Sequence, residues 1–251
     1  MIRVILWDID NTLLSFNKAE KAALHKDFAE FSLGEFTEDM LKEYVVINKR
    51  CWQALERGEM TKLEVTVGRF VEFFTMYGID TSIAPAFNER YQELLGEFIY
   101  FNDDAYEIIK DLKGKVLQCG ATNGTKIAQT GKLKNSGLGE LLDMVFISED
   151  VGAEKPAKVF FDKALIDVNQ WLFQNEGTLE YAMGKEMGVL QRDEILMIGD
   201  SLTSDIKGAN NAGIKSCWYN PEGVPCDKEV QIDYEIKDLH EVFDILKVNK
   251  C

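Results

Sequence analysis

Five short runs of apolar residues recur along the chain, and each is followed closely by small, hydroxyl-bearing or acidic residues. They occupy residues 3–7, 116–121, 144–148, 194–198 and 215–219. Their length and their content of β-branched residues are typical of buried β-strands. Helical patterns lie among them at residues 104–112, 125–134, 157–166 and 204–212. Strand alternating with helix predicts an α/β fold built on a doubly wound parallel sheet.

Residues 16–100 break this alternation, because they contain amphipathic helical patterns and no convincing strand. One helix is predicted over residues 37–57, where Thr-Glu-Asp makes a favourable start and Gly58 an end. Another is predicted over residues 61–77 and ends at Gly78 in the same way. The sequence therefore predicts an all-helical domain of about four helices at residues 16–100. The α/β core would be formed by residues 1–15 and 101–251.

Residues 167–190 form a longer connection than a helix-to-strand junction usually needs. Two interpretations are open. The segment is either a helical elaboration on the surface, or it contacts the helical insertion or a partner subunit and alters specificity.

Composition and charge narrow the possible partners. The chain has 251 residues, of which 46% are hydrophobic and 28% charged, as expected of a globular protein with a sizeable core. Its 28 basic and 43 acidic residues give a formal net charge of −15, which disfavours binding to nucleic-acid polymers and to anionic membranes. No signal peptide or membrane span is expected. An enzyme of this charge that acts on an anionic substrate needs a local positive centre.

The five cysteines are scattered without a CxxC pair, and the two histidines lie far from any cysteine cluster. We therefore expect neither a disulfide framework nor a zinc site. Free thiols suit a reducing compartment, so a cytoplasmic protein is expected. The sequence does not indicate an oligomeric state.

Four groups of polar residues follow predicted strands, and the first is Asp8 with Asp10. Residues i and i+2 of an extended chain point the same way, so both carboxylates can face one pocket. A plain polar turn is the ordinary alternative. A calcium loop is disfavoured, because Leu13 and Ala19 stand where an EF-hand requires glycine and glutamate.

The second and third groups offer hydrogen-bond donors and a cation. Thr122, Asn123 and Gly124 provide a hydroxyl and backbone N–H groups at the start of a helix, which suits a phosphate, although Asn-Gly also makes ordinary turns. Lys155 would lie at the top of the sheet, and Pro156 can occupy the first position of the next helix. Most lysines are simply solvated, so Lys155 alone is a weak signal.

The fourth group is Asp200 with Asp205, the latter at the start of a helix, where the helix dipole alone would also favour an acid. Ligands of open α/β sheets bind outside the carboxyl ends of the strands, so all four groups are expected to meet in one crevice. Close carboxylates repel by roughly 4 kcal/mol per pair at about 4 Å and an effective dielectric near 20. A hard divalent cation removes this repulsion, and oxygen ligands beside an anionic substrate indicate Mg²⁺.

In their order and spacing, DIDNT, ATNG, the Lys155-Pro156 pair and GDSLTSD resemble the four motifs of the haloacid dehalogenase superfamily. The resemblance spans essentially the whole chain and implies a Rossmann-like core whose helical insertion is a type-one cap. It implies that Asp8 is a nucleophile that forms an aspartyl phosphate, and that Asp10 is the general acid and base. True dehalogenases of the superfamily lack the second aspartate and use no metal, so the resemblance indicates a magnesium-dependent phosphatase.

The same resemblance implies ligands for the phosphoryl group and the metal. The residues implied to bind the phosphoryl group are Thr122, Asn123 and Lys155. The residues implied to hold Mg²⁺ are Asp8, Asp200 and Asp10, the last through its backbone carbonyl. Asp205 would support the metal without contacting it.

A narrower resemblance involves the pyrimidine 5′-nucleotidases of the superfamily, which act on nucleoside monophosphates. It rests on residues 52–59, on the Arg69-Phe70 pair and on residues 199–223, where Trp218-Tyr219-Asn220 is the most distinctive piece. It implies that the leaving group is bound near Trp52, Arg57 and Gly58. The aromatic residues after the last strand are equally compatible with ordinary packing.

Other functions share the same catalytic residues. The alternatives are a phosphatase of phosphoglycolate or a sugar phosphate, a phosphomutase similar to β-phosphoglucomutase, and a non-enzymatic binding protein. A binding protein would be free to lose Asp8 or Asp10, yet every motif residue is present. The expected partner is therefore a small phosphate monoester, most specifically a nucleoside monophosphate, with no nucleic-acid polymer and no membrane.

Overall fold

A single parallel sheet forms the centre of the protein in the computed structural model, which describes residues 1–174 and 190–248. Its six strands lie in the order β3-β2-β1-β4-β5-β6. The strands are β1 (Val4–Trp7), β2 (Leu117–Thr122), β3 (Met144–Ile147), β4 (Ile195–Gly199), β5 (Lys215–Tyr219) and β6 (Tyr234–Ile236). The predicted α/β fold with a doubly wound parallel sheet is confirmed, as are the five predicted strands. The sixth was not expected from the sequence.

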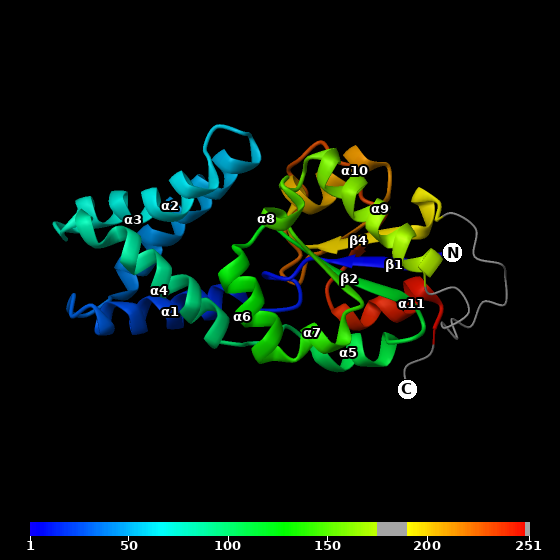
Figure 1. Ribbon diagram of the computed structural model, residues 1–251, viewed down its shortest axis with the longest axis horizontal. Coiled ribbons are helices and arrows are strands. Elements are labelled where there is room, and N and C mark those ends of the chain that lie inside the picture. The colour runs from blue at the N-terminus through cyan, green and yellow to red at the C-terminus, as the bar shows by residue number, and fades with distance from the viewer. Residues whose placement is uncertain (175–189, 249–251) are drawn as a thin grey trace.

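Helices cover both faces of this sheet (Figure 1). Helices α9 (Lys158–Gln174) and α10 (Lys207–Ala212) lie on one face, and α5 (Ala105–Leu112), α7 (Leu138–Leu141) and α11 (Val242–Leu246) lie on the other. Along β1, Val4 and Leu6 pack in the hydrophobic cluster that contains residues of α9 and α10. Ile5 and Trp7 pack in the cluster on the other face, which contains residues of α5, α7 and α11. A strand buried on both faces needs apolar side chains at every position, which explains the continuous apolar runs of the sequence.

Short helical turns complete the core and lie close to the ends of the strands. They are α8 (Ser148–Val151), the 3₁₀ turns Arg192–Glu194 and Leu239–Glu241, and a π-helical turn at Leu202–Ile206 that leads into α10. The sequence suggested that Pro156 occupies the first position of a helix. This prediction is wrong, since α9 begins two residues later, at Lys158. The Lys155–Pro156 peptide bond is cis.

Residues 16–97 form a separate helical lobe (Figure 1). Its helices are α1 (Phe16–Glu30), α2 (Glu38–Glu56), α3 (Lys62–Tyr77) and α4 (Ala84–Glu97), with a 3₁₀ turn at Thr81–Ile83. The predicted starts and ends are confirmed, since Thr61 forms a capping box with Glu64 and Gly78 ends α3 at a φ of 66°. The lobe has its own aromatic core, formed by the fully buried rings of Tyr44, Phe70, Phe73, Phe74 and Phe87.

The helical lobe is joined to the core by two adjacent chain crossings. The Ser15 N–H donates to the Tyr100 carbonyl at 2.7 Å, and the Asn102 N–H donates to the Leu13 carbonyl at 3.0 Å. These contacts support boundaries near residues 15/16 and 100/101, although the domain limits themselves stay a prediction. Helix α4 also packs directly on α6 (Lys126–Ser136) of the core. A Cβ on Gly96 would lie 2.9 Å from the Gly131 Cα, so this approach requires glycine on both helices.

The long connection at residues 167–190 is described only in part. Its first residues continue α9 as far as Gln174, beyond the predicted end at residue 166. The remaining positions, 175–189, lie outside the described residues, as does the choice between the two interpretations of this segment. In the part of the chain that the structure describes, no helix is long and apolar enough to cross a bilayer.

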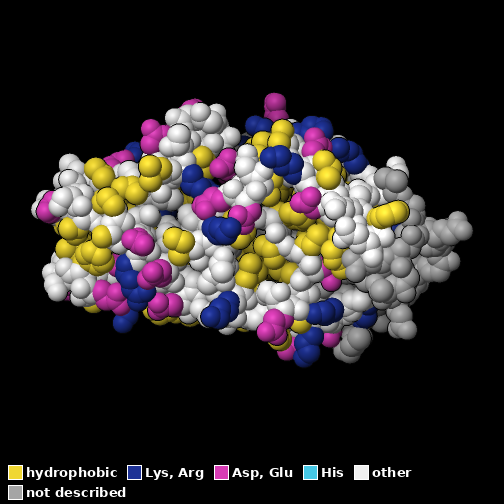
Figure 2. Space-filling view, in the orientation of Figure 1, with side chains coloured by type: hydrophobic (Ala, Val, Ile, Leu, Met, Phe, Trp, Pro, Cys, Tyr) yellow, Lys and Arg dark blue, Asp and Glu magenta, His cyan; other side chains and the backbone are white. Residues whose placement is uncertain are grey.

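Charged side chains of both signs are interspersed on the face shown in Figure 2. On the helical lobe, Arg90 pairs with Glu30, Glu93 and Glu97 at 2.7 to 2.9 Å. These pairs are partly exposed, so each contributes little to folding.

Asp27 on α1 is a buried carboxylate with neither oxygen hydrogen-bonded among the described residues. Burial, together with the nearby Glu30, raises its pKa to about 8, while Arg90 opposes the shift. The folded protein therefore keeps a proton on Asp27 that the unfolded chain releases at a much lower pH. Its contribution to stability is fully present below about pH 4 and is lost as the pH rises towards about 8.

We expect Asp27→Asn to remove this pH dependence. The melting temperature of the variant should exceed that of the wild type by an amount that grows between pH 5 and pH 9 and reaches roughly 2–6 °C. Thermal unfolding at constant ionic strength measures the difference. Asp244→Asn on α11, which alters an exposed carboxylate, should leave the profile unchanged. A difference for Asp27→Asn that is the same at every pH would show that the side chain is not protonated in the fold.

Candidate active site

A cavity of about 220 Å³ opens where the carboxyl ends of β1, β2 and β4 face the helical lobe. The core contributes most of the polar lining, and helices α2, α3 and α4 contribute part of the opposite wall. The cavity brings together all but two of the site residues predicted from the sequence, namely Asp8, Asp10, Trp52, Thr122, Asn123, Lys155, Asp200 and Asp205. The topology accounts for this, because side chains that follow parallel strands share one edge of the sheet.

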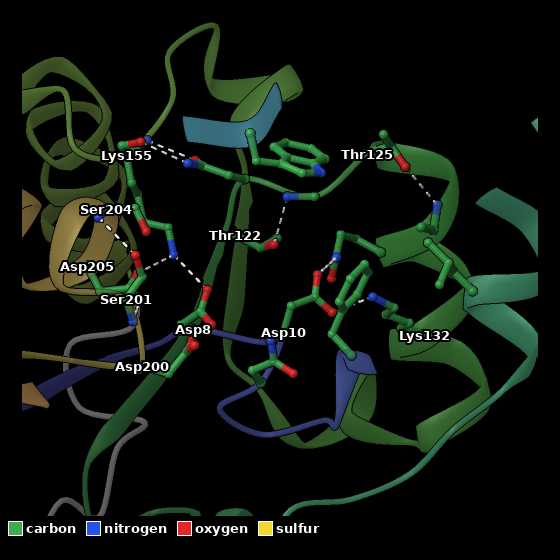
Figure 3. Close-up of a pocket in the computed structure, with 18 of the residues that line it drawn as sticks. Asp8, Asp10, Thr122, Thr125, Lys132, Lys155, Asp200, Ser201, Ser204 and Asp205 are labelled. Atoms are coloured by element: carbon green, nitrogen blue, oxygen red, sulfur yellow. Dashed lines mark hydrogen bonds and ion pairs between the residues drawn. The ribbon is translucent and has the colours of Figure 1, made fainter. Parts of the chain in front are cut away.

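Lys155 is the buried cation of the site, with a relative exposure of 1%. Its Nζ donates to Asp8 Oδ1 at 2.7 Å, to Asp205 Oδ1 at 2.7 Å and to the Ala121 carbonyl at 2.6 Å (Figure 3). Burial disfavours its charge, yet the two carboxylates outweigh burial and raise the pKa of Lys155 above its usual value. The side chain is therefore a permanent positive charge, which is what an acidic protein needs to bind an anion.

Asn123 places Lys155 through the main chain. Its amide nitrogen donates to the Lys155 carbonyl, and its amide oxygen accepts from the Lys155 N–H, both at 2.8 Å. These two contacts fix the orientation of the Asn123 side chain, and its second amide N–H and its backbone N–H are the donors that remain for a phosphate. Thr122 is buried, and its hydroxyl oxygen accepts from the Gly124 N–H at 3.0 Å, which leaves the hydroxyl proton for another acceptor.

Asp8 lies at the centre of the polar residues. One oxygen accepts from Lys155, and the other accepts from the Thr12 hydroxyl at 3.1 Å. Burial raises the pKa of Asp8 to about 7, Lys155 opposes this shift, and Asp205 adds to it. The Thr12 hydroxyl oxygen also accepts a hydrogen bond from the Asp200 N–H at 3.1 Å, so this side chain links the ends of β1 and β4. No role for Thr12 was predicted from the sequence, although it lies only four residues after Asp8.

Three of the four carboxylates expected from the sequence to cluster do so, namely Asp8, Asp200 and Asp205, whereas the Asp10 carboxylate does not join them. Each of the three offers an oxygen within 4.8 Å of the others. Burial, followed by repulsion from Asp8 and Asp205, raises the pKa of Asp200 well above its usual value. A largely buried set of hard oxygen donors, two of which have raised pKa values (Asp8 and Asp200), fits Mg²⁺. Asp205 already accepts from Lys155 and from the Ser201 N–H at 3.0 Å, which agrees with an indirect role.

The Asp10 carboxylate points away from this cluster, towards α6 (Figure 3). It accepts from the Gln129 amide at 2.7 Å and from Lys132, which are both buried. Neither residue was predicted from the sequence. Their spacing of three positions on a predicted helix was the available signal, but nothing in the sequence indicates that this face of the helix turns towards the end of β1.

The helical lobe contributes Phe16, Trp52, Glu56, Arg69, Gln92 and Leu95 to the cavity wall. Of these, only Trp52 was predicted as a substrate residue. Arg57 and Gly58 are exposed and do not line the cavity; Arg57 pairs instead with Glu59 at 2.6 Å. Their role in substrate binding stays a prediction that the cavity does not support.

Arg69 is held in the cavity wall by a buried polar network. Its guanidinium donates to Asn48 at 2.6 Å, and Asn48 in turn donates to Glu20 at 2.8 Å. Burial raises the pKa of Glu20 to about 7, and Arg69 opposes that shift. The ring of Tyr91 lies 5.1 Å from the guanidinium, which adds a cation–π contact.

Two further contacts close the lobes together beside the cavity. The Thr125 hydroxyl donates to Gln92 at 2.6 Å, and Lys62 donates to the Ser148 hydroxyl at 2.7 Å.

Trp218 belongs to the most distinctive piece of the narrower resemblance to the nucleotidases. Its side chain is buried, and its indole N–H donates to the Asp200 carbonyl at 2.9 Å. Its packing role is therefore the one the structure supports.

Comparison with known proteins agrees with this geometry. Residues 5–219 match the haloacid dehalogenase-like hydrolases. The chain is 35% identical over 246 residues to the HAD-hydrolase YfnB of Bacillus subtilis (strain 168), covering 98% of this chain and 96% of YfnB. It is 32% identical over 249 residues to the pyrimidine 5′-nucleotidase PynA of Streptococcus pneumoniae, covering 98% of this chain and 96% of PynA. The pyrimidine 5′-nucleotidase YjjG of Escherichia coli (strain K12) is 27% identical, with 96% of each chain covered.

A solved structure extends the comparison to three dimensions. The crystal structure of YfnB bound to magnesium superimposes with a TM-score of 0.84 and 33% identity, covering 98% of this chain and 99% of YfnB. That structure is described as revealing interdomain movement.

Proposed function

The chain belongs to the haloacid dehalogenase-like hydrolases, and on that premise we propose that it hydrolyses pyrimidine nucleoside 5′-monophosphates through an aspartyl phosphate on Asp8. Its class is that of a phosphoric monoester hydrolase. The observation that carries the proposed mechanism is the contact of a permanently charged, buried lysine with the Asp8 carboxylate. The four described cysteines are unpaired, which supports a reducing compartment such as the cytosol.

In the first half-reaction, an oxygen of Asp8 attacks phosphorus and the bond to the leaving oxygen breaks. The Thr122 hydroxyl and Lys155, whose Nζ gives up one of its three acceptors to do so, donate to the phosphoryl oxygens, whose charge they stabilise as the transition state forms. Asp10 gives its proton to the leaving alkoxide. In the second half-reaction, Asp10 takes a proton from water as the water oxygen bonds to phosphorus, which frees Asp8 and releases phosphate.

The carboxylates of Asp8 and Asp200, with the backbone carbonyl of Asp10, would hold Mg²⁺. Asp205 would stabilise this site without contacting the metal. When bound, the cation neutralises the carboxylate cluster and the charge of the phosphoryl group. Asp205 meanwhile keeps Lys155 in place through its 2.7 Å contact.

The leaving-group end of the cavity supports a nucleoside. Phe16, Trp52 and Leu95 offer aromatic and apolar surface, and Gln92 and Arg69 add a few polar groups. A flat base with hydrogen-bonding edges suits such a wall, because aromatic faces stack on it and amide or guanidinium groups read its edge. A sugar phosphate or phosphoglycolate would leave the apolar surface without a partner. The names of PynA and YjjG support the same substrate class.

We expect a phosphate-release screen to show a preference for pyrimidine substrates. With Mg²⁺, kcat/KM for UMP, dUMP or dTMP should exceed that for glucose phosphates and phosphoglycolate by about tenfold or more, because only a base fills the aromatic wall. Trp52→Ala should lower kcat/KM for UMP by roughly 10–100-fold and that for phosphoglycolate much less. Val46→Ala, an exposed apolar residue on the same helix, is the control and should leave both unchanged. A flat or sugar-selective profile would contradict the nucleotidase assignment.

A further inference from the structure

Lys132 is a buried cation that the proposed mechanism does not use. It lies on α6 with a relative exposure of 1%, and its Nζ donates to Asp10 Oδ1 (Figure 3). Burying an ammonium group costs several kcal/mol unless a partner compensates it. The Asp10 carboxylate provides that compensation, and the ring of Phe16 lies 5.1 Å from the Nζ. The contact therefore has two effects. It offsets the cost of burying the Lys132 charge, and it fixes the position of one oxygen of Asp10.

Gln129 fixes the other oxygen. Its Nε2 donates to Asp10 Oδ2 at 2.7 Å, and its side chain is completely buried. Its Oε1 has no hydrogen-bond partner among the described residues, which is an uncommon and costly condition for a buried amide. The hydrogen bond to Asp10 is thus what orients this amide.

Gly124 gives this arrangement the space it needs. A Cβ at this position would lie 2.1 Å from Gln129 Nε2, so a side chain there would displace the amide. The glycine of the ATNG motif, expected from the sequence to serve a turn at the phosphate site, therefore also admits Gln129 to Asp10.

We propose that Lys132 is a positioning residue which, together with Gln129, holds the Asp10 carboxyl group where it can exchange a proton with the leaving oxygen. The inference rests on the proposed function. Lys132 transfers no proton itself and does not contact the phosphoryl group. With both Asp10 oxygens held from the α6 side, the side chain keeps one rotamer. Misplacing a reacting group by about 1 Å can lower a rate about 100-fold.

The choice of ester separates this role from a purely structural one. An alkyl ester such as UMP needs a proton on its leaving oxygen, whereas p-nitrophenyl phosphate releases a stable anion and needs little acid assistance. In Lys132→Met we expect kcat/KM for UMP to fall about 100-fold and that for p-nitrophenyl phosphate to fall less than about fivefold. KM for UMP should change little, since the lysine is bound to Asp10 and not to substrate.

Lys134→Met is the matched control, because it removes an exposed lysine from the same helix and should affect neither ester. Gln129→Met removes the second contact without changing charge and should show the same dependence on the ester. It also provides the test if Lys132→Met does not fold, as judged by circular dichroism. Equal losses on the two esters would overturn the inference. Failure of the wild type to hydrolyse UMP would instead contradict the proposed function, so the two failures are distinguishable.

Discussion

Replacing Asp8 with asparagine is expected to lower phosphate release by at least about 10,000-fold, to the background of the assay. The amide of asparagine cannot act as the nucleophile that displaces the leaving group. The change also removes one of the two negative partners of Lys155, which contacts Asp8 at 2.7 Å and keeps its contact with Asp205. Among the described residues, none of the other acids of the site is placed to replace the nucleophile, because Asp200 and Asp205 follow a different strand and the Asp10 carboxylate points towards α6.

The fold should survive this substitution. Burial raises the pKa of Asp8 to about 7, so an ionised carboxylate is unfavourable there in the absence of metal, and a neutral side chain of the same shape removes that cost. The melting temperature of the metal-free variant should therefore equal or exceed that of the wild type. Asp193→Asn, in an exposed turn before β4, is the control and should keep full activity. Retention of even a few per cent of activity by Asp8→Asn would exclude Asp8 as the nucleophile.

The sheet was predictable because its signal is local. Each central strand is buried on both faces, so it reads as an unbroken apolar run, and the helix starts at Thr37 and Thr61 carry their own capping signals. Strand β6 was missed because it has only three residues, of which Glu235 is exposed. Helix α9 extends beyond its predicted end because no glycine or proline follows to stop it before residue 174.

The polar residues that follow the strands were predictable for a different reason. The carboxyl ends of parallel strands lie at the same edge of the sheet, so the topology alone brings Asp8, Thr122 and Asp200 together. Lys132 and Gln92 were not predictable, since their positions depend on how α6 and α4 pack against each other. That packing rests on the approach of Gly96 to Gly131, and glycines in two helices 35 positions apart carry no visible signal that they touch.

Removal of divalent metal is expected to abolish turnover, and Mg²⁺ is expected to restore it. Without a cation, the oxygens of Asp8, Asp200 and Asp205 lie within 4.8 Å of one another, and Lys155 is the buried positive charge among them. A phosphate dianion added to that cluster would be repelled. Phosphate release after treatment with EDTA should fall to about 1% or less and recover on addition of excess Mg²⁺. Metal-independent turnover would contradict the role assigned to the carboxylate cluster.

Stability gives a second measurement of the same site. Burial raises the pKa of Asp8 to about 7 and that of Asp200 well above its usual value, so the metal-free fold holds protons that the unfolded chain releases. The stability that protonated Asp8 contributes is present below about pH 4 and is lost as the pH rises through about 7, and the raised pKa of Asp200 acts in the same direction. Mg²⁺ binds the ionised carboxylates, so its affinity rises over the same range. The gain in melting temperature on adding Mg²⁺ should therefore be larger at pH 8 than at pH 5.5, and Asp200→Asn should lose most of it. A gain that is equal at both pH values, or that persists in Asp200→Asn, would place the bound cation elsewhere on the protein.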